Sequence, residues 1–188
     1  MKKRCEWVEG QPEIYIKYHD DEWGIPSYGD GYLFEMILLE SFHCGLSWLI
    51  ILKKREAFRK AFDQFDPNVI KDYSSEKVQE LMNNSEIVRN KAKILANIGN
   101  AKAFLKVQEE FGTFSTYIWS FTDNKVQFGD FDQLVTTNKL SDTVSKDMKK
   151  RGFKFMGSVT TYSYLEAIGV MNNHSRSCFR NHGNYDNL

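Results

Sequence analysis

The chain has 188 residues, of which 41% are hydrophobic and 14% aromatic. This composition supports a packed core and excludes an intrinsically disordered chain. Lys and Arg total 25, as do Asp and Glu, so the formal net charge is zero. A neutral total argues against a protein that coats nucleic acid without specificity, although it is compatible with a local basic face. No run of about 18 apolar residues occurs, so we expect no membrane span.

The first seven residues lack the apolar stretch of a signal peptide, which predicts a cytoplasmic protein. The three cysteines, Cys5, Cys44 and Cys178, cannot all pair within the chain. In a reducing compartment we expect them to be free thiols or metal ligands rather than disulfides. The length favours one domain over residues 1–188, and we expect a monomer.

Helical periodicity dominates the sequence and strand-like alternation is scarce, so the predicted fold is mainly α. Residues 33–41 are apolar nearly all round, which is typical of a buried helix. Residues 53–65 carry apolar side chains at helical spacing and end just before Pro67. Ser75 is predicted to cap a helix that continues to Met82.

The second half of the chain also predicts helices with recognisable ends. These are residues 91–105; residues 114–121, capped by Thr113; a helix capped by Ser141 and stopped by Gly152; and residues 159–168, stopped by Gly169. Residues 122–140 are largely polar and predict a long loop.

His174 and Cys178 are four residues apart, a spacing that would put both side chains on one side of a helical turn. Cys5 and His19 form a second pair near the other end of the chain. Two sulfurs and two imidazoles form a tetrahedral zinc set with no open position for water. We therefore expect a structural zinc that joins the N- and C-terminal segments, remote from any chemistry.

Spacing alone leaves other interpretations of these residues open. A single Cys or His is more often a buried hydrophobe or a surface side chain than a ligand. Cys44, His43 and His182 are competing ligands, and we expect His182 to be solvated in the polar tail.

Glu40 follows Met36 and Ile37 by four and three positions, so it should project from an apolar helix face. A carboxylate placed there is partly desolvated, which raises its pKa unless a cation or hydrogen-bond donors compensate. The alternative is a glutamate at a helix end, bonded to backbone or to arginine. Aromatic residues concentrate in nearby segments: Trp7, Tyr15, Tyr18, Trp23 and Trp48. They are typical either of plain core or, with Glu40, of a pocket for a flat, electron-poor ring.

Ordered motifs extend from about residue 4 to residue 178. They include Arg4-Cys5-x-Trp7, Tyr18-His19-Asp20-x-Glu22-Trp23-Gly24, Leu33-Phe34-Glu35, Leu39-Glu40, Gly45-Leu46-Ser47-Trp48, Phe65-Asp66-Pro67, Trp119-Ser120-Phe121 and His174-x-x-x-Cys178. At these residues the sequence resembles the DNA-3-methyladenine glycosylase I family of the helix-hairpin-helix glycosylase superfamily.

The resemblance implies a monofunctional base-excision repair enzyme. It would flip 3-methyladenine out of alkylated double-stranded DNA, hydrolyse the N-glycosidic bond and leave an abasic site. It implies that Cys5, His19, His174 and Cys178 bind zinc and that Glu40, Tyr18 and Trp48 form the base pocket, with Trp7, Tyr15 and Trp23 as further pocket aromatics. Glu40 is the candidate catalytic residue.

The same resemblance implies a residue that wedges into the base stack and a hairpin that binds DNA. Leu46 matches the region that enters the base stack. The helix-hairpin-helix region would cover about residues 76–105, where Arg89, Lys91 and Lys93 are candidates to hold phosphates. A second basic group, around Lys149 to Lys154, is also ordinary for a helix C-terminus.

Some features depart from the pattern or favour other classes. Residues 85–91 lack the glycine-rich turn usual in the superfamily, Cys44 stands where a small alanine is common, and the superfamily's catalytic aspartate is absent from the matched family. The alternatives are a zinc-dependent nucleobase hydrolase or deaminase, and a non-catalytic protein that binds alkylated DNA. The sequence lacks the paired-cysteine motif with a neighbouring glutamate that a deaminase needs.

Overall fold

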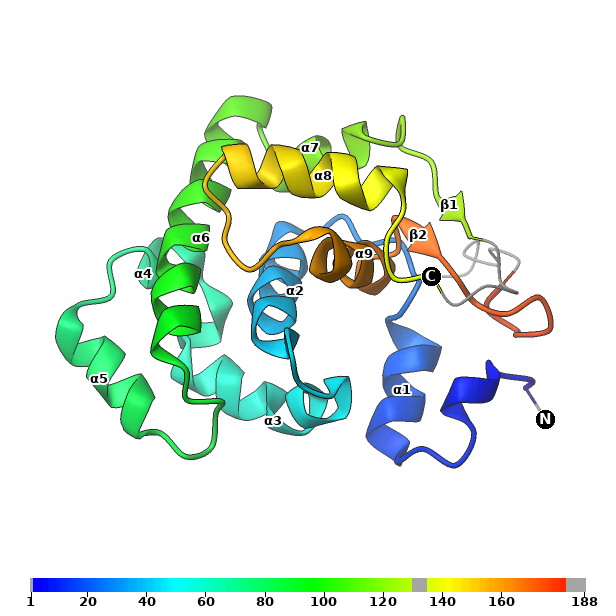
Figure 1. The fold of residues 1–188 in the computed structure, drawn as a ribbon, viewed down its shortest axis with the longest axis horizontal. Helices are drawn as coiled ribbons and strands as arrows, with labels where there is room; N and C mark the ends of the chain where they lie inside the picture. Colours follow the sequence, from blue (N-terminus) through cyan, green and yellow to red (C-terminus); the bar gives the residue numbers. More distant parts are fainter. Residues whose placement is uncertain (1, 130–134, 182–188) are drawn as a thin grey trace.

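The structure, a computed structural model, describes residues 2–129 and 135–181. It is mainly helical, as predicted (Figure 1). The α-helices are α1 (Glu13–Asp21), α2 (Asp30–His43), α3 (Trp48–Ala61), α4 (Pro67–Ile70), α5 (Ser75–Asn83), α6 (Lys91–Phe111), α7 (Phe114–Ser120), α8 (Lys139–Lys150) and α9 (Ser158–Ala167). Short 3-10 turns cover η1 (Glu6–Val8) and η2 (Asp63–Phe65). None of the helices described is both long and apolar enough to cross a membrane.

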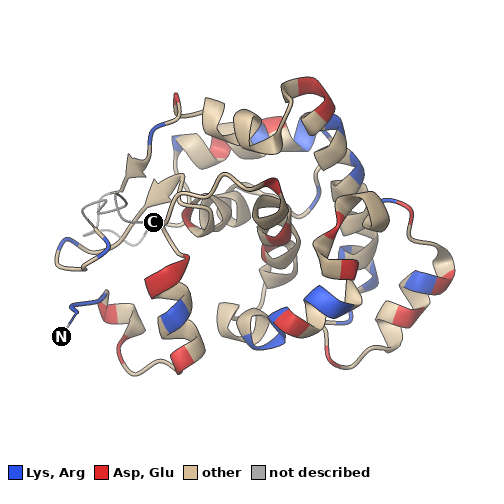
Figure 2. Ribbon diagram, turned by 180° about the vertical axis from the view of Figure 1, so that it is seen from behind, with Lys and Arg blue, Asp and Glu red and all other residues tan. Residues whose placement is uncertain are grey.

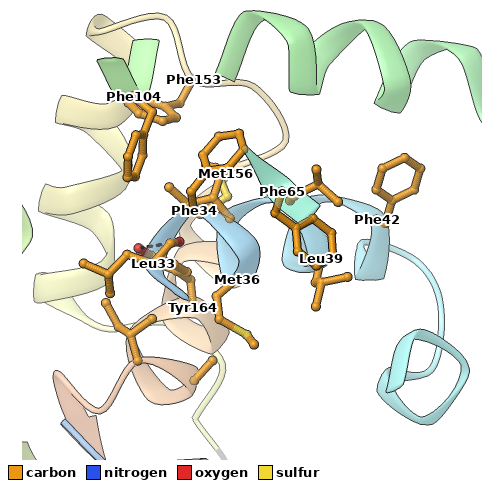
Figure 3. Close-up of a cluster of buried hydrophobic side chains, with 14 of the residues drawn as sticks. Leu33, Phe34, Met36, Leu39, Phe42, Phe65, Phe104, Phe153, Met156 and Tyr164 are labelled. Atoms are coloured by element: carbon orange, nitrogen blue, oxygen red, sulfur yellow. Dashed lines mark hydrogen bonds between the residues drawn. The ribbon is translucent and has the colours of Figure 1, made fainter. Parts of the chain in front are cut away.

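Helix α2 is the centre of the molecule. It packs against α3, α6, α7 and α9, and all ten residues from Leu33 to Phe42 are buried. Aromatic rings from other helices surround it, and the Tyr164 hydroxyl of α9 donates to the Leu33 carbonyl at 3.2 Å (Figure 3). Each large apolar side chain buried here contributes about 1.5–3 kcal/mol to folding. The prediction of a buried helix is confirmed, and α2 is a rigid base for side chains at its C-terminal end.

Several helix ends differ from the sequence expectations. The helix expected to continue to Phe65 ends at Ala61, because Asp63, Gln64 and Phe65 have positive φ angles of 48°, 58° and 59°. It also begins earlier, at Trp48. The cap of α5 is Ser74, one residue before the predicted Ser75.

Helix α8 also begins at a cap other than the predicted one. Its N-cap is Asn138, and Ser141 is the third residue of a capping box with it. Thr113 caps α7 as predicted. The expected loop at 122–140 contains a two-residue strand, β1 (Gln127–Phe128), paired in parallel with β2 (Met171–Asn172).

The two ends of the described chain lie together beside α1 (Figure 1). Phe179 donates its backbone N–H to the Lys3 carbonyl at 2.9 Å. Arg180 Nε donates to the Asp20 carbonyl of α1 at 2.7 Å. The segments that carry the predicted metal ligands are therefore adjacent.

Candidate active site

A cavity of about 190 Å³ opens beside the C-terminal end of α2. It is smaller than the roughly 300–1,000 Å³ of pockets for drug-sized ligands, so it suits one flat ring system. All six residues predicted for the base pocket line it, together with three that were not predicted there: Trp7, Tyr15, Tyr18, Trp23, Glu40 and Trp48, with His43, Ser163 and Glu166. Segments distant in sequence, from η1 to α9, thus meet at one site.

The aromatic walls support one another through edge contacts. The Trp7 ring lies 5.4 Å from Tyr15 and 5.0 Å from Trp23, both in T-shaped arrangements. On the other wall, Tyr18 and Trp48 have ring centroids 5.3 Å apart. Trp48 is buried, and its Nε1 has no hydrogen-bond partner among the described residues. The indole therefore keeps a donor available beside the cavity.

Glu40 lies in the last turn of α2 and only 2% of it is exposed. Its Oε2 is 3.0 Å from His43 Nδ1. Burial raises the pKa of Glu40, while the hydrogen bond from His43 opposes that rise. Among the described residues, no lysine or arginine forms an ion pair with Glu40. His43, considered as a metal ligand from sequence, instead orients this carboxyl group.

Glu35, five residues earlier on α2, shows the contrasting arrangement. Its Oε1 accepts from Arg55 Nε and from Arg59 Nη2, both at 2.7 Å. Arg55 also donates to Glu22. The alternative interpretation of Glu40, a helix glutamate fixed by arginine, thus describes Glu35 and does not describe Glu40.

Glu166 brings a second carboxyl group to the cavity from α9. Asn173 Nδ2 donates to its Oε1 at 2.7 Å. Burial, with a smaller contribution from the charge of Glu40, raises the pKa of Glu166 to about 8. Glu166 was not among the residues predicted for the pocket. Its only sequence signal is the i, i+3 spacing from Ser163, which also lines the cavity.

The four predicted metal ligands, Cys5, His19, His174 and Cys178, converge in a buried cluster. His174 Nδ1 lies 3.2 Å from His19 Nε2 and 3.5 Å from the sulfurs of Cys5 and Cys178. Tetrahedral zinc, with bonds of about 2.0–2.1 Å to nitrogen and about 2.3 Å to sulfur, would set such N–N and N–S pairs about 3.3 and 3.6 Å apart. The donor set and its spacing fit this ion.

The second nitrogen of each imidazole has its own partner. His19 Nδ1 is 2.8 Å from Asp20 Oδ1, and Arg4 holds that carboxylate from the other side. His174 Nε2 is 2.8 Å from the Trp23 carbonyl. Such contacts fix the tautomer that presents a lone pair to a metal. Burial also lowers the pKa of His174 to about 4, which keeps the ring neutral and able to coordinate.

Two features of the cluster correct the sequence expectations. Neither His174 nor Cys178 is on a helix. Cys178 closes a turn, with its N–H donating to the Ser175 carbonyl, and His174 directly precedes that turn. The cluster is also close to the cavity: the His174 ring is 4.6 Å from Trp23, and the His19 ring is 5.3 Å from Trp7. Of the competing ligands, Cys44 is exposed. His182 lies outside the described residues.

The predicted DNA-contact residues divide into exposed and buried groups. Leu46 is 37% exposed in the turn between α2 and α3, after Gly45, whose φ is +82°. Arg89, in the connection between α5 and α6, and Lys91, the first residue of α6, are exposed. Lys93 is buried, and its Nζ donates to the carbonyls of Phe42 and Cys44 at 2.9 and 2.6 Å. The expectation that Lys93 holds a phosphate is therefore wrong.

These features define a class: a helical protein with an aromatic, acid-bearing pocket of a size for one flat ring system and a neighbouring Cys₂His₂ cluster able to bind a metal. Comparison with known proteins supports the family resemblance that the sequence motifs indicated. The methyladenine glycosylase family model matches residues 7–181. DNA-3-methyladenine glycosylase 1 of Escherichia coli is 42% identical over 94% of this chain and 95% of its own. DNA-3-methyladenine glycosylase of Haemophilus influenzae is 42% identical over 95% and 97%.

Solved structures of such glycosylases are also similar to this chain over most of its length. A crystal structure of a 3-methyladenine DNA glycosylase I has a TM-score of 0.88 at 44% identity, covering 95% of this chain and 99% of that one. The Staphylococcus aureus enzyme, described for its recognition of 3-methyladenine, has a TM-score of 0.89 at 36% identity, covering 95% and 96%. This chain belongs to the methyladenine glycosylase family.

Proposed function

We propose that this protein is a monofunctional DNA glycosylase of base-excision repair that releases 3-methyladenine from alkylated DNA. The observation that carries the proposal is the cavity beside α2. There the buried carboxyl group of Glu40 lies among aromatic rings, and no lysine or arginine of the part of the chain that the structure describes pairs with it. A positively charged purine complements both features, through Coulomb attraction to the carboxylate and through cation–π contact with the rings.

The substrate base must leave the duplex, because its glycosidic bond is inaccessible within the stack. Flipping costs a few kcal/mol, and less where pairing is already damaged. Leu46 would enter the vacated space as an apolar wedge, since it is exposed on a short turn directly before Trp48 of the cavity.

The chemistry needs little acid catalysis. Methylation at N3 makes the adenine cationic, so the electron pair of the breaking C1′–N9 bond neutralises the departing base. Water then adds to C1′ and loses a proton. Glu40 would accept from the exocyclic amine, with Tyr18 and Trp48 against the ring. Trp7, Tyr15 and Trp23 would complete the wall that excludes bulk water.

DNA would be held by the hairpin formed by α5, the connecting residues 84–90 and α6, which we interpret as the helix-hairpin-helix element. Arg89 and Lys91 are exposed there, at the N-terminal end of α6. Positive charge and free backbone amides at a helix N-terminus favour a phosphate. Figure 2 shows Lys and Arg mixed with Asp and Glu over many helices, so phosphate binding must rely on such local sites.

The Cys₂His₂ cluster would hold a structural zinc through Cys5, His19, His174 and Cys178. A bound zinc would supply a covalent link between the two chain ends. Four protein ligands leave no position for a reactive water, which disfavours a zinc-dependent hydrolase. We place the enzyme in the cytoplasm as a monomer.

The decisive experiment is incubation of the purified protein with methylated duplex DNA, with chromatography of the released bases and an assay for abasic sites. The expected product is free 3-methyladenine and intact strands carrying abasic sites. Binding without base release would instead identify a non-catalytic reader. Release of a deaminated base, or activity proportional to an exchangeable metal, would identify a metal-dependent hydrolase.

A further inference from the structure

Two carboxyl groups line the small cavity, and each comes from a different helix. Glu40 belongs to α2 and Glu166 to α9, and these two helices pack against each other. They interact electrostatically, since the charge of Glu40 raises the pKa of Glu166. Burial disfavours the ionised form of each group, and two ionised carboxylates in one cavity would add mutual repulsion to that cost. The pair should therefore share one negative charge near neutral pH.

The neighbours of the two groups decide which carboxyl group keeps the proton. Glu40 has His43 at 3.0 Å, a partner that favours its ionised form. Within residues 2–129 and 135–181, the side-chain partner of the Glu166 carboxyl group is the neutral Asn173 amide, whose Nδ2 also donates to the Tyr162 hydroxyl at 2.8 Å. Among the described residues, Glu166 forms no ion pair. The proton is accordingly held on Glu166, in keeping with its pKa of about 8.

We propose that Glu166 is a second base-recognition residue, which meets the flipped purine as a neutral carboxylic acid and donates a hydrogen bond to a ring nitrogen. This inference rests on the proposed function. The two carboxyl groups would then have complementary roles, with Glu40 accepting from the exocyclic amine and Glu166 donating to a neighbouring ring nitrogen. Adenine presents that donor–acceptor combination, whereas guanine presents a carbonyl in place of the amine.

Asn173 acts as a positioning residue in this arrangement. Its amide fixes Glu166 Oε1 at 2.7 Å, which leaves Oε2 as the oxygen able to carry the proton and face the base. Glutamine at position 166 would reproduce these properties, because its carbonyl can accept from Asn173 while its amide donates. Leucine has similar volume and offers neither group. The two substitutions therefore separate hydrogen bonding from shape.

The test measures binding of free 3-methyladenine, by quenching of the pocket tryptophans, and kcat/KM on methylated DNA. At pH 7, E166Q is expected to retain affinity and kcat/KM within about threefold of the wild type. E166L should weaken both by about tenfold or more, because the ring nitrogen and Asn173 lose a partner. E109Q, an exposed glutamate on α6, is the matched charge control and should bind the base as the wild type does.

A pH series supplies a second, independent readout. Through pH 8 the wild type should lose base affinity as Glu166 releases its proton, whereas E166Q should not follow that decline. The other titratable groups near Glu166 are present in both proteins, which makes E166Q the matched comparison. Glu40 and His43 on α2 and Tyr15 and Tyr18 on α1 line the cavity, and Tyr162 on α9 shares the Asn173 amide with Glu166.

Several results would overturn this role while leaving the proposed function intact. They are wild-type affinity in E166L, a tenfold loss in E166Q at pH 7, or parallel pH profiles for E166Q and the wild type. If E166L fails to fold, as judged by its melting curve, the E166Q profile alone decides. Absence of 3-methyladenine release by the wild type would instead contradict the proposed function itself.

Discussion

Replacing Glu40 with glutamine is expected to reduce base excision while preserving or increasing the stability of the protein. The substitution keeps the shape of the side chain and an oxygen that can accept from His43 Nδ1, 3.0 Å away. It removes the negative charge from a site that is only 2% exposed. In the proposed mechanism the cationic base therefore loses its charged partner, while the folded protein loses a buried charge.

The expected loss of kcat/KM follows from the kind of contact proposed for Glu40, a hydrogen bond to a charged group. A hydrogen bond to a charged group contributes about 1.5–3 kcal/mol, and each 1.36 kcal/mol changes a rate about tenfold. E40Q should therefore lower kcat/KM by roughly 10- to 150-fold.

Stability should change in the opposite direction. Burial raises the pKa of Glu40 in the folded state, so its contribution to stability is full below the unfolded pKa and is lost as pH rises through the folded pKa. At pH 7.5 the wild type bears the cost of this ionised group and E40Q does not. For a chain of this size, each 1 kcal/mol of relief raises Tm by about 2–4 °C. The difference should shrink toward pH 5.

The assay compares single-turnover release of 3-methyladenine, thermal melting at pH 5 and 7.5, and metal content. Glu35→Gln is the matched control on the same helix. Because Glu35 accepts from Arg55 and Arg59 at 2.7 Å, its substitution should lower Tm without removing the pocket charge. An E40Q protein with wild-type release rates would refute the role of Glu40. A lower Tm for E40Q at pH 7.5 would refute the electrostatic reasoning.

Five further substitutions test the remaining parts of the site. Leu46→Ala should slow release from duplex DNA but leave affinity for the free base unchanged; equal release would exclude a wedge. Arg89→Ala and Lys91→Ala should each reduce the slope of log K against log salt by about 1, and an unchanged slope would remove that residue from the phosphate contacts. Lys93→Met should lower stability by about 1–3 kcal/mol in denaturant unfolding, because two carbonyls at the end of α2 lose their donor, without altering the salt slope; a reduced slope would return Lys93 to the DNA interface. Cys178→Ser should lower metal content and Tm together, and a metal-free protein of equal stability without activity would favour a catalytic zinc.

The sequence predicted those features that depend on local pattern or residue type. The continuous apolar run of α2 indicated burial, and Thr113 was correctly identified as a cap. The caps of α5 and α8 were assigned to Ser75 and Ser141, whereas Ser74 and Asn138 have the extended backbone of an N-cap. Neighbouring polar residues compete for that role, and the backbone conformation that decides between them is set by the preceding loop.

The family resemblance predicted the pocket and the Cys₂His₂ cluster, but other features created by packing between distant segments were not predicted. In the sequence, Lys93 is indistinguishable from the other basic residues of the hairpin. In the structure, the start of α6 packs against the end of α2, and Lys93 is buried at that contact. Glu166 belongs to no motif singled out from the sequence, and only the docking of α9 on α2 brings it to the cavity. Strands β1 and β2 are far apart in the chain and each has two residues. Segments this short cannot show the alternating pattern by which a strand is predicted.

The two glutamates of α2 explain why the pocket should prefer a cationic purine to ordinary adenine. Glu35 has its charge matched by two arginines within the protein. Glu40 has no arginine or lysine partner among the described residues, so its charge remains incompletely matched while the cavity lacks a base. Neutral adenine could offer Glu40 hydrogen bonds but would displace water from a carboxylate without supplying positive charge. A 3-methylated adenine supplies that charge where the effective dielectric constant is low and the attraction is correspondingly strong. On the proposed function, selectivity for the lesion would therefore follow from leaving one buried carboxylate to be neutralised by the substrate.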